Sequence, residues 1–224
     1  MKFIHAIDLD NPHPCWNLRI SGRLQTPNCM AAIDRGIAET YRPIGSISID
    51  ELRETGPYGN VVTPRTGYVL IKAAALRNHN SYLDGYGREV LVSTDSRTEI
   101  LKLADQELEF ERVRRIVNNS HVSRIACLWL AERSDQGRAH VKSMLGEHIY
   151  VLDVAITWNL ALTRVDTTWF DAYWADPKEE FIHGYWSQSP FGDTPKWEYL
   201  LDGEISIEDA AQLEHVVKNG NIQW

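Results

Sequence analysis

The sequence predicts an α+β fold in one domain, with a largely antiparallel sheet. Strand-like and helix-like segments mix along the 224 residues without the regular alternation that is typical of a βαβ protein. The last strand-like segments are separated by short turns, and short turns favour antiparallel pairing. No internal repeat, low-complexity segment or long linker divides the sequence, so we expect residues 1–224 to form a single domain.

The composition is that of a globular protein, with 43% apolar and 24% charged residues. The net charge of −8 argues against broad electrostatic binding to nucleic acid, although a basic cluster from Arg112 to Lys142 leaves a local basic groove open. The three cysteines are too few for a disulfide framework, and no apolar run reaches the length of a membrane span. Because the first ten residues do not resemble a signal peptide, we expect a cytoplasmic protein without a membrane partner.

The first half of the chain predicts few regular elements. Alternation predicts a strand over residues 2–7, which contains His5, and a short helix over 16–24 that Gly22 stops. Residues 25–68 have weak periodicity and scattered glycine and proline, and within them we predict a strand end that leads into a helix start at 47–53. Further on we predict a strand or the start of a buried helix at 68–72, a polar loop at 77–90 and a short strand at 89–93.

The second half gives stronger signals, of which the helix at 105–119 is the clearest. Acidic residues crowd its first half and arginines follow, an order that complements the helix dipole. The further predicted elements are a buried strand at 125–131, a helix at 136–145 capped by Ser134 and Asp135, strands at 149–157 and 160–165, a helix at 176–185, strands at 198–201 and 204–207 joined by a tight turn, and a helix at 207–217.

The common motifs of phosphate, metal and acyl chemistry are not present in the sequence. It contains no P-loop, no G-x-G-x-x-G after a strand, no H-E-x-x-H, no paired C-x-x-C and no G-x-S-x-G. His13, Cys15 and Cys29 could supply part of a zinc site, but a fourth ligand is not evident. We therefore expect a protein without a metal.

Glu198 is the residue that most strongly suggests chemistry, because a carboxylate in an aromatic strand is costly without a partner or a ligand. His5 in the first strand and Ser123-Arg124 before a buried strand are the further candidates. Each also has a structural interpretation. Glu198 could point outward from an edge strand, His5 could be a structural histidine, and Ser123 and Arg124 could pair with an acid such as Glu109 or Glu111.

Two segments carry a resemblance to known proteins. Residues 109–115 and 121–130 resemble a bacterial family with the recurring signature E-x-x-R … P-S-R … (S/C)-(I/L)-F, and His121 stands where that family often has proline. A hairpin-like segment at 149–154, Tyr185-Trp186 and the strand at 197–201 follow in the same order. This order of motifs is similar to the ADP-ribosyltransferase superfamily. The resemblance covers residues 105–207, whereas residues 25–104 do not align and would hold a family-specific insertion.

The resemblance implies split, largely antiparallel sheets that form an NAD-binding cleft flanked by helices. Glu198 would stabilise the oxocarbenium-like ribose that forms when nicotinamide leaves NAD. His5 would bind the adenosine-side ribose, and Ser123 would brace the ribose or the glutamate. Arg124 would bind a phosphate, and Tyr150 or a tryptophan would stack on nicotinamide.

The function that follows from the resemblance is transfer of ADP-ribose from NAD to a macromolecule, either a protein or a nucleic acid. Relatives with this pattern act as toxins or phage-defence effectors, so an antitoxin or another partner protein is also expected. Two alternatives remain open, namely an NAD glycohydrolase that uses water as the acceptor, and a non-catalytic binding subunit with the same fold.

Overall fold

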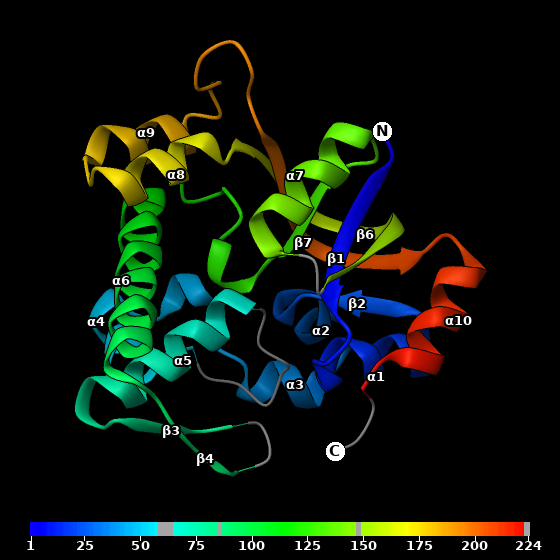
Figure 1. Ribbon diagram of the computed structural model, residues 1–224, viewed down its shortest axis with the longest axis horizontal. Helices are drawn as coiled ribbons and strands as arrows, with labels where there is room; N and C mark the ends of the chain where they lie inside the picture. Colours follow the sequence, from blue (N-terminus) through cyan, green and yellow to red (C-terminus); the bar gives the residue numbers. More distant parts are fainter. Residues whose placement is uncertain (58–64, 85–86, 147–148, 222–224) are drawn as a thin grey trace.

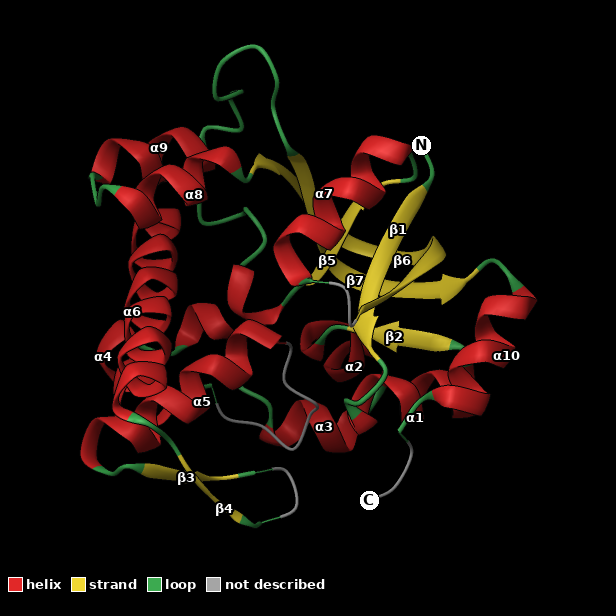
Figure 2. Ribbon diagram, viewed as in Figure 1, coloured by secondary structure: helices red, strands yellow, loops and turns green. Residues whose placement is uncertain are grey.

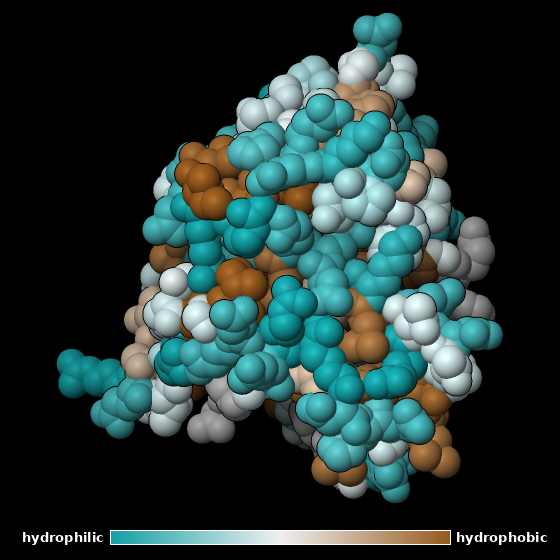
Figure 3. Space-filling model, turned by 90° about the vertical axis from the view of Figure 1, so that its left-hand side faces the viewer, coloured by the Kyte–Doolittle hydropathy of each residue, from teal (hydrophilic) through white to brown (hydrophobic). Residues whose placement is uncertain are grey.

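The protein has an α+β fold in which a five-stranded antiparallel sheet lies to one side of a group of helices (Figures 1 and 2). The computed structural model describes residues 1–57, 65–84, 87–146 and 149–221. Within these ranges, no helix combines the length and the apolar character that crossing a membrane requires. The face formed by α6, α8 and α9, at the left of Figure 1, is mostly hydrophilic with separate apolar patches (Figure 3).

The main sheet closes on itself, because strand β6, at one end of the strand order, pairs with β1 and also with β7, the second strand from the other end. The order is β2-β7-β5-β1-β6, and β6 also pairs with β7. The strands are β1 (Phe3–Asp8), β2 (Arg23–Gln25), β5 (Leu128–Glu132), β6 (Ile149–Asp166) and β7 (Trp197–Ile207). Every pair is antiparallel, as the sequence predicts.

The two faces of strand β7 enter different cores, because successive side chains of a strand point to opposite faces. On β7, Tyr199 and Leu201 enter a core inside the closed sheet together with Phe3 and Leu130. Leu200 points the other way, into a second core formed with helices α6 and α9. The position of Glu198 follows from this alternation, since it shares the face of Leu200.

The described residues of 25–104 are mainly helical, and Leu52 and Leu70 of this region pack in one core with Leu108. The elements between residues 12 and 117, besides β2, are α1 (Pro12–Ser21), α2 (Pro27–Ile33), α3 (Arg35–Thr40), η1 (Ile44–Ser46), α4 (Ile49–Thr55), α5 (Arg65–Asn78), β3 (Ser81–Leu83), β4 (Glu89–Leu91) and α6 (Thr94–Val117).

Two helix ends follow local signals in the sequence, one at the end of α1 and one at the start of α7. Gly22 ends α1 with a φ of 68°, a left-handed conformation that glycine adopts without steric cost. The Ser134 hydroxyl accepts a hydrogen bond from the Gly137 amide at the start of α7, which confirms the predicted cap. The later elements are η2 (Arg124–Ala126), α7 (Asp135–Leu145), α8 (Thr168–Ala175), α9 (Glu179–Trp186) and α10 (Ala210–Asn219).

The prediction of a tight turn between two strands at residues 198–207 is wrong. Residues 197–207 form one continuous strand, in which Gly203 lies opposite Asn159. A Cβ atom on Gly203 would lie 2.1 Å from the Trp158 carbonyl oxygen. The glycine therefore allows β6 and β7 to approach closely, and it does not form a turn that reverses the chain. Similarly, the strands predicted at 149–157 and 160–165 are one strand with two register shifts.

Other predicted boundaries also change. The helix predicted from residue 105 begins at Thr94, where Ser93 caps it. The strand predicted to begin at residue 125 begins at Leu128, because residues 124–126 form a 3-10 turn. Residues 68–72 are helical, and the polar loop at 77–90 contains one strand and part of the next of the β3–β4 hairpin, with residues 85–86 outside the described ranges.

Candidate functional site

Glu198 lies on the outer face of the sheet, under helices that bury it almost completely. The residue is 2% exposed, and its neighbour Leu200 on the same face packs in the core formed with α6 and α9. Among the described residues, neither carboxylate oxygen of Glu198 has a hydrogen-bond partner. An unsatisfied buried carboxylate costs free energy, so this position requires an explanation other than fold stability.

The nearest titratable group to Glu198 is His140 of helix α7. Its Nε2 lies 3.6 Å from Oε1 of Glu198, a distance that suits an ion pair but is too long for a good hydrogen bond. The same Nε2 lies 3.0 Å from Oγ1 of Thr167. Since the Thr167 hydroxyl donates its one proton to the Lys196 carbonyl at 2.9 Å, it accepts from His140. The neutral imidazole therefore carries its proton on Nε2, directed toward Thr167 and Glu198.

The surroundings of this carboxyl–imidazole pair act on the ionisation of Glu198 in opposite directions. Burial raises the pKa of Glu198, and the nearby His140 and Arg124 oppose that change only in part. The Nδ1 atom of His140 and the Oγ1 atom of Thr168 are also buried without a hydrogen-bond partner among the described residues. Both members of this carboxyl–imidazole pair thus keep buried polar atoms without a partner among the described residues, as side chains do at sites that bind or transform a ligand.

Arg124 is close enough to Glu198 to influence its charge, but its guanidinium is bound elsewhere. Its Nε and Nη2 donate to both carboxylate oxygens of Glu107 at 2.7 Å, and its Nη1 donates to the hydroxyl of Tyr185. The rings of Trp129 and Phe170 cover it at 4.3 Å and 4.1 Å. A phosphate could reach Arg124 only by displacing Glu107, so the structure favours a positioning role for this residue.

Ser123 adopts the structural alternative that the sequence left open. Its hydroxyl donates to Oε2 of Glu111 at 2.9 Å and accepts from the Ile125 amide at 3.2 Å. Burial opposes ionisation of Glu111, but Arg114 and Arg115 hold its pKa below the usual range. The Ser123 side chain therefore belongs to a buried ionic network and does not contact Glu198.

His5 lies where strands β1 and β5 separate. The β1–β5 ladder contains Phe3 and Ile4 only, and the next residue, His5, places Nδ1 2.8 Å from the Trp129 carbonyl oxygen. Because a carbonyl only accepts, Nδ1 carries the proton and Nε2 keeps a lone pair. Burial lowers the pKa of this half-buried histidine, which keeps it neutral.

Tyr150 does not join this region. Its ring stacks on the imidazole of His215 in α10, with 4.3 Å between the ring centroids and an interplanar angle of 14°. It also packs against the core inside the closed sheet, which is the core interpretation of this residue. The structure therefore brings Arg124 near Glu198, connects His5 to Arg124 through Trp129, and leaves Ser123 and Tyr150 in separate environments.

Sequence reasoning missed His140 and Thr167, which complete the surroundings of Glu198. His140 falls on a correctly predicted helix, but nothing in the spacing along that helix indicates which strand the imidazole faces. Across residues 1–57, 65–84, 87–146 and 149–221, no group of three or more His, Cys, Asp or Glu side chains is placed to hold a metal ion.

The fold and this site together define an α+β protein with a buried carboxyl–imidazole pair between its sheet and helix α7. Residues 66–214 match the model of a family described as "Protein of unknown function (DUF2441)", and the chain belongs to that family. The match includes Glu198, His140, Ser123 and Arg124 but not His5. A comparison with curated proteins gave no match to the chain.

Proposed function

We propose that the protein transfers ADP-ribose from NAD to a macromolecular acceptor, with Glu198 as the catalytic carboxylate. The observation that carries the proposal is the buried carboxylate of Glu198, with both oxygens unpartnered among the described residues and His140 Nε2 at 3.6 Å. A group that stability does not require, next to an imidazole that can exchange a proton, is typical of an active site.

The proposed reaction breaks the bond between ribose C1′ and the nicotinamide nitrogen, and nicotinamide leaves with the electron pair. An oxygen or nitrogen nucleophile of the acceptor then bonds to C1′ and releases a proton. Ionised Glu198 would stabilise the positive charge that develops on the ribose, and charge stabilisation is most effective where water is excluded. His140 would take the released proton on Nδ1, the ring nitrogen that carries no proton in this tautomer, and Thr167 would hold the imidazole in place.

The structure changes the roles that we assign to the remaining residues. His5 keeps a proposed contact with a ribose hydroxyl, because its Nε2 lone pair is not used by the Trp129 carbonyl. Arg124 and Ser123 are proposed as positioning residues, since Glu107 and Glu111 bind their side chains. Tyr150 receives no role in this site because it stacks on His215. Because Glu198 is 2% exposed, we expect α7, which supplies His140, to move when substrate binds.

The test is to incubate the purified protein and a cell lysate with NAD labelled on the adenylate. Label on a macromolecule supports transfer, whereas free nicotinamide without labelled macromolecule supports NAD hydrolysis. Both activities should fall at least a hundredfold in Glu198→Gln, in line with the loss of an oxyanion-hole donor of comparable importance.

The matched control is Glu204→Gln, which alters a second buried glutamate of the same strand. Glu204 is 4% exposed and is satisfied by Arg23, Gln25 and Thr157. The Glu204→Gln variant should therefore be less stable than wild type, and its activity per folded molecule should be unchanged. If wild type and Glu198→Gln are equally inert toward NAD, the enzyme proposal is lost and a non-catalytic subunit becomes the better explanation.

A further inference from the structure

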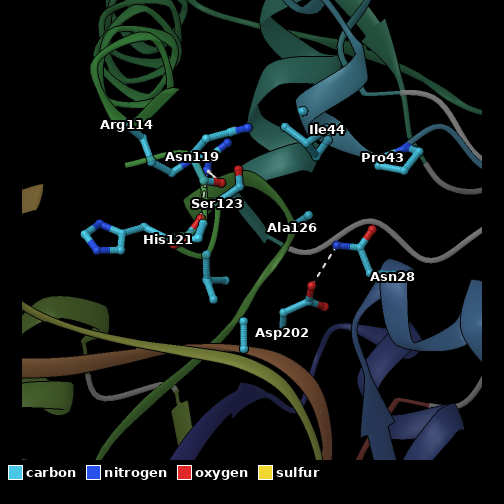
Figure 4. A pocket seen from close by; sticks show the side chains of 13 residues that line it. Asn28, Pro43, Ile44, Arg114, Asn119, His121, Ser123, Ala126 and Asp202 are labelled. Atoms are coloured by element: carbon cyan, nitrogen blue, oxygen red, sulfur yellow. Dashed lines mark hydrogen bonds between the residues drawn. The ribbon is translucent and has the colours of Figure 1, made fainter. Parts of the chain in front are cut away.

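A cavity of about 190 Å³ lies where the sheet meets the helical part of the chain, and Glu198 is not among the residues that line it (Figure 4). Asn28, Ile44, Ser123, Ala126, Ala161 and Asp202 are among the residues that line it. Its rim includes the exposed residues Gly45, Asn119 and Ser120, so the cavity is open to solvent. A cavity of about 150 Å³ holds a benzene molecule, whereas drug-sized ligands need about 300–1,000 Å³. The space therefore suits one planar group and is too small for a dinucleotide.

The irregular pairing of β6 with β7 places a carboxylate in this cavity. Two register shifts bring Asp202 opposite Ala161, and both residues line the cavity. The methyl group of Ala161 leaves open the space that a larger side chain would fill. In Figure 4, the Asp202 carboxylate is turned toward Asn28, and a dashed line marks the hydrogen bond between them.

The Asp202 carboxylate is held by neutral groups only. Its two oxygens accept from Oγ1 of Thr26 at 2.6 Å and from Nδ2 of Asn28 at 2.7 Å. Within the described part of the chain, no cationic group forms an ion pair with Asp202. Since a carboxylate accepts about four hydrogen bonds, about two acceptor sites remain. The charge also acts on its surroundings, because burial together with Glu204 and Asp202 raises the pKa of Cys29 to about 11.

The cation that lines the far side of the cavity does not offer its N–H groups to a ligand. Arg114 donates through Nε and Nη2 to Glu111, and through Nη1 to the carbonyl oxygens of Asn119 and His121. The cavity therefore presents one uncompensated carboxylate next to the apolar atoms of Ile44, Val122 and Ala126.

We propose that this cavity binds a guanidinium group carried on an aliphatic stem. A guanidinium is planar and weakly hydrated, so its faces tolerate apolar walls while its forked N–H groups bond the carboxylate edge. An ammonium is compact and strongly hydrated, and it would lose more hydration in this cavity than it regains. The stem would leave through the open rim. The guanidinium can belong to an arginine side chain of a peptide or to a small molecule, and the cavity would bind it in the same way in both cases.

The proposal is tested by titrating the full chain with methylguanidinium and with N-acetyl-arginine methylamide, using NMR shifts or calorimetry. We expect saturable binding of both, at least tenfold tighter than binding of methylammonium and of N-acetyl-citrulline methylamide, which lack the fork or the charge. A short arginine peptide that binds more tightly than methylguanidinium identifies a protein as the source of the group. Equal affinities identify a small molecule.

Two variants act on the cavity by different means. Asp202→Asn removes the charge, and Ala161→Leu fills the space, so each should weaken binding at least tenfold. Asp193→Asn alters an exposed carboxylate elsewhere and should leave binding unchanged. Thermal unfolding identifies a variant that does not fold. In that case, the binding affinity of the other variant tests the proposal. Absence of saturable binding, or equal affinity in wild type and in folded Asp202→Asn or Ala161→Leu, overturns the proposal. Because Glu198 is not part of this cavity, the result is independent of NAD turnover.

Discussion

Two glutamates of strand β7 should respond in opposite directions to the same substitution. Glu198 and Glu204 are 2% and 4% exposed, and Glu→Gln removes the charge of either while keeping its size. Glu198 has no hydrogen-bond partner among the described residues, whereas Glu204 accepts from Arg23 at 2.9 Å, Gln25 at 2.6 Å and Thr157 at 2.5 Å. We expect Glu198→Gln to stabilise the protein and Glu204→Gln to destabilise it.

The magnitudes follow from the cost of burying an unsatisfied group and from the value of charged hydrogen bonds. Relief of the burial cost at Glu198 should raise the free energy of unfolding at pH 7 by about 1–3 kcal/mol. For a chain of this length, that corresponds to a rise in Tm of about 2–10 °C. Weakening the bonds of Glu204 should lower the free energy of unfolding by about 1.5–3 kcal/mol.

The stability difference between wild type and each variant should change with pH, and the direction of that change differs between the two glutamates. The pKa of Glu198 is raised in the folded protein, mainly by burial, so its protonated form favours folding. That contribution is complete below the unfolded pKa of about 4.3 and is lost as pH rises through the folded value. The advantage of Glu198→Gln should therefore be small near pH 4 and grow with rising pH.

The contribution of Glu204 runs in the opposite direction. Burial works against ionisation, yet Thr157, Gln25 and Arg23 lower the pKa of Glu204 overall. Its stabilising contribution is therefore present above the unfolded pKa and is lost as pH falls through the folded value. The deficit of Glu204→Gln should be largest near neutral pH and shrink in acid.

The assay is urea denaturation followed by circular dichroism, for wild type and both variants, from about pH 4 to pH 8. The slope of the free energy against urea should be the same for all three, which shows that only stability has changed. A loss of more than about 1 kcal/mol in Glu198→Gln at pH 7 refutes the reasoning, because Glu198 would then be a satisfied structural residue. The proposed catalytic role would lose its main support with it.

Two further predictions concern the surroundings of the site, and both are measured by urea denaturation. Arg124→Leu leaves Glu107 buried without its bidentate partner and should cost about 3–5 kcal/mol, and adding Glu107→Leu should recover most of that loss. If the double variant is no better than the single one, the pair is not the source of the effect. Gly203→Ala places a Cβ atom 2.1 Å from the Trp158 carbonyl oxygen, so it should cost more than about 2 kcal/mol. A neutral result would show that the strands can separate there without cost.

Local chemistry made several elements predictable. Gly22 and Ser134 mark helix ends because their backbone and side-chain preferences act within one turn of the chain. The same local reasoning failed at Asp202-Gly203, where a typical turn pair lies inside one long strand. The close approach of the Trp158 carbonyl decides that outcome, and this atom is 45 positions away in sequence.

The candidate site was predictable only in part, for a similar reason. Glu198 could be singled out because a carboxylate among aromatic neighbours in a strand is unusual at the level of sequence. Its partner His140 could not, because a helix position does not specify the strand that the helix covers. Ser123 and Arg124 were singled out as ligand-binding residues, with pairing to an acid as the alternative, and the acids that bind them, Glu111 and Glu107, became known only from the packing.

By itself, the sequence determined the α+β class and most helices of the second half, and it singled out Glu198 as a carboxylate in an apolar strand. These features depend on residues that are neighbours in the sequence, such as alternating apolar residues, helix caps and a charge in an apolar segment. They can therefore be predicted before the tertiary structure is known. The tertiary structure alone decided the closed sheet, the pairing of Glu198 with His140 and the cavity at Asp202. These features depend on which faces meet across long separations, and the packing of the whole chain fixes that choice.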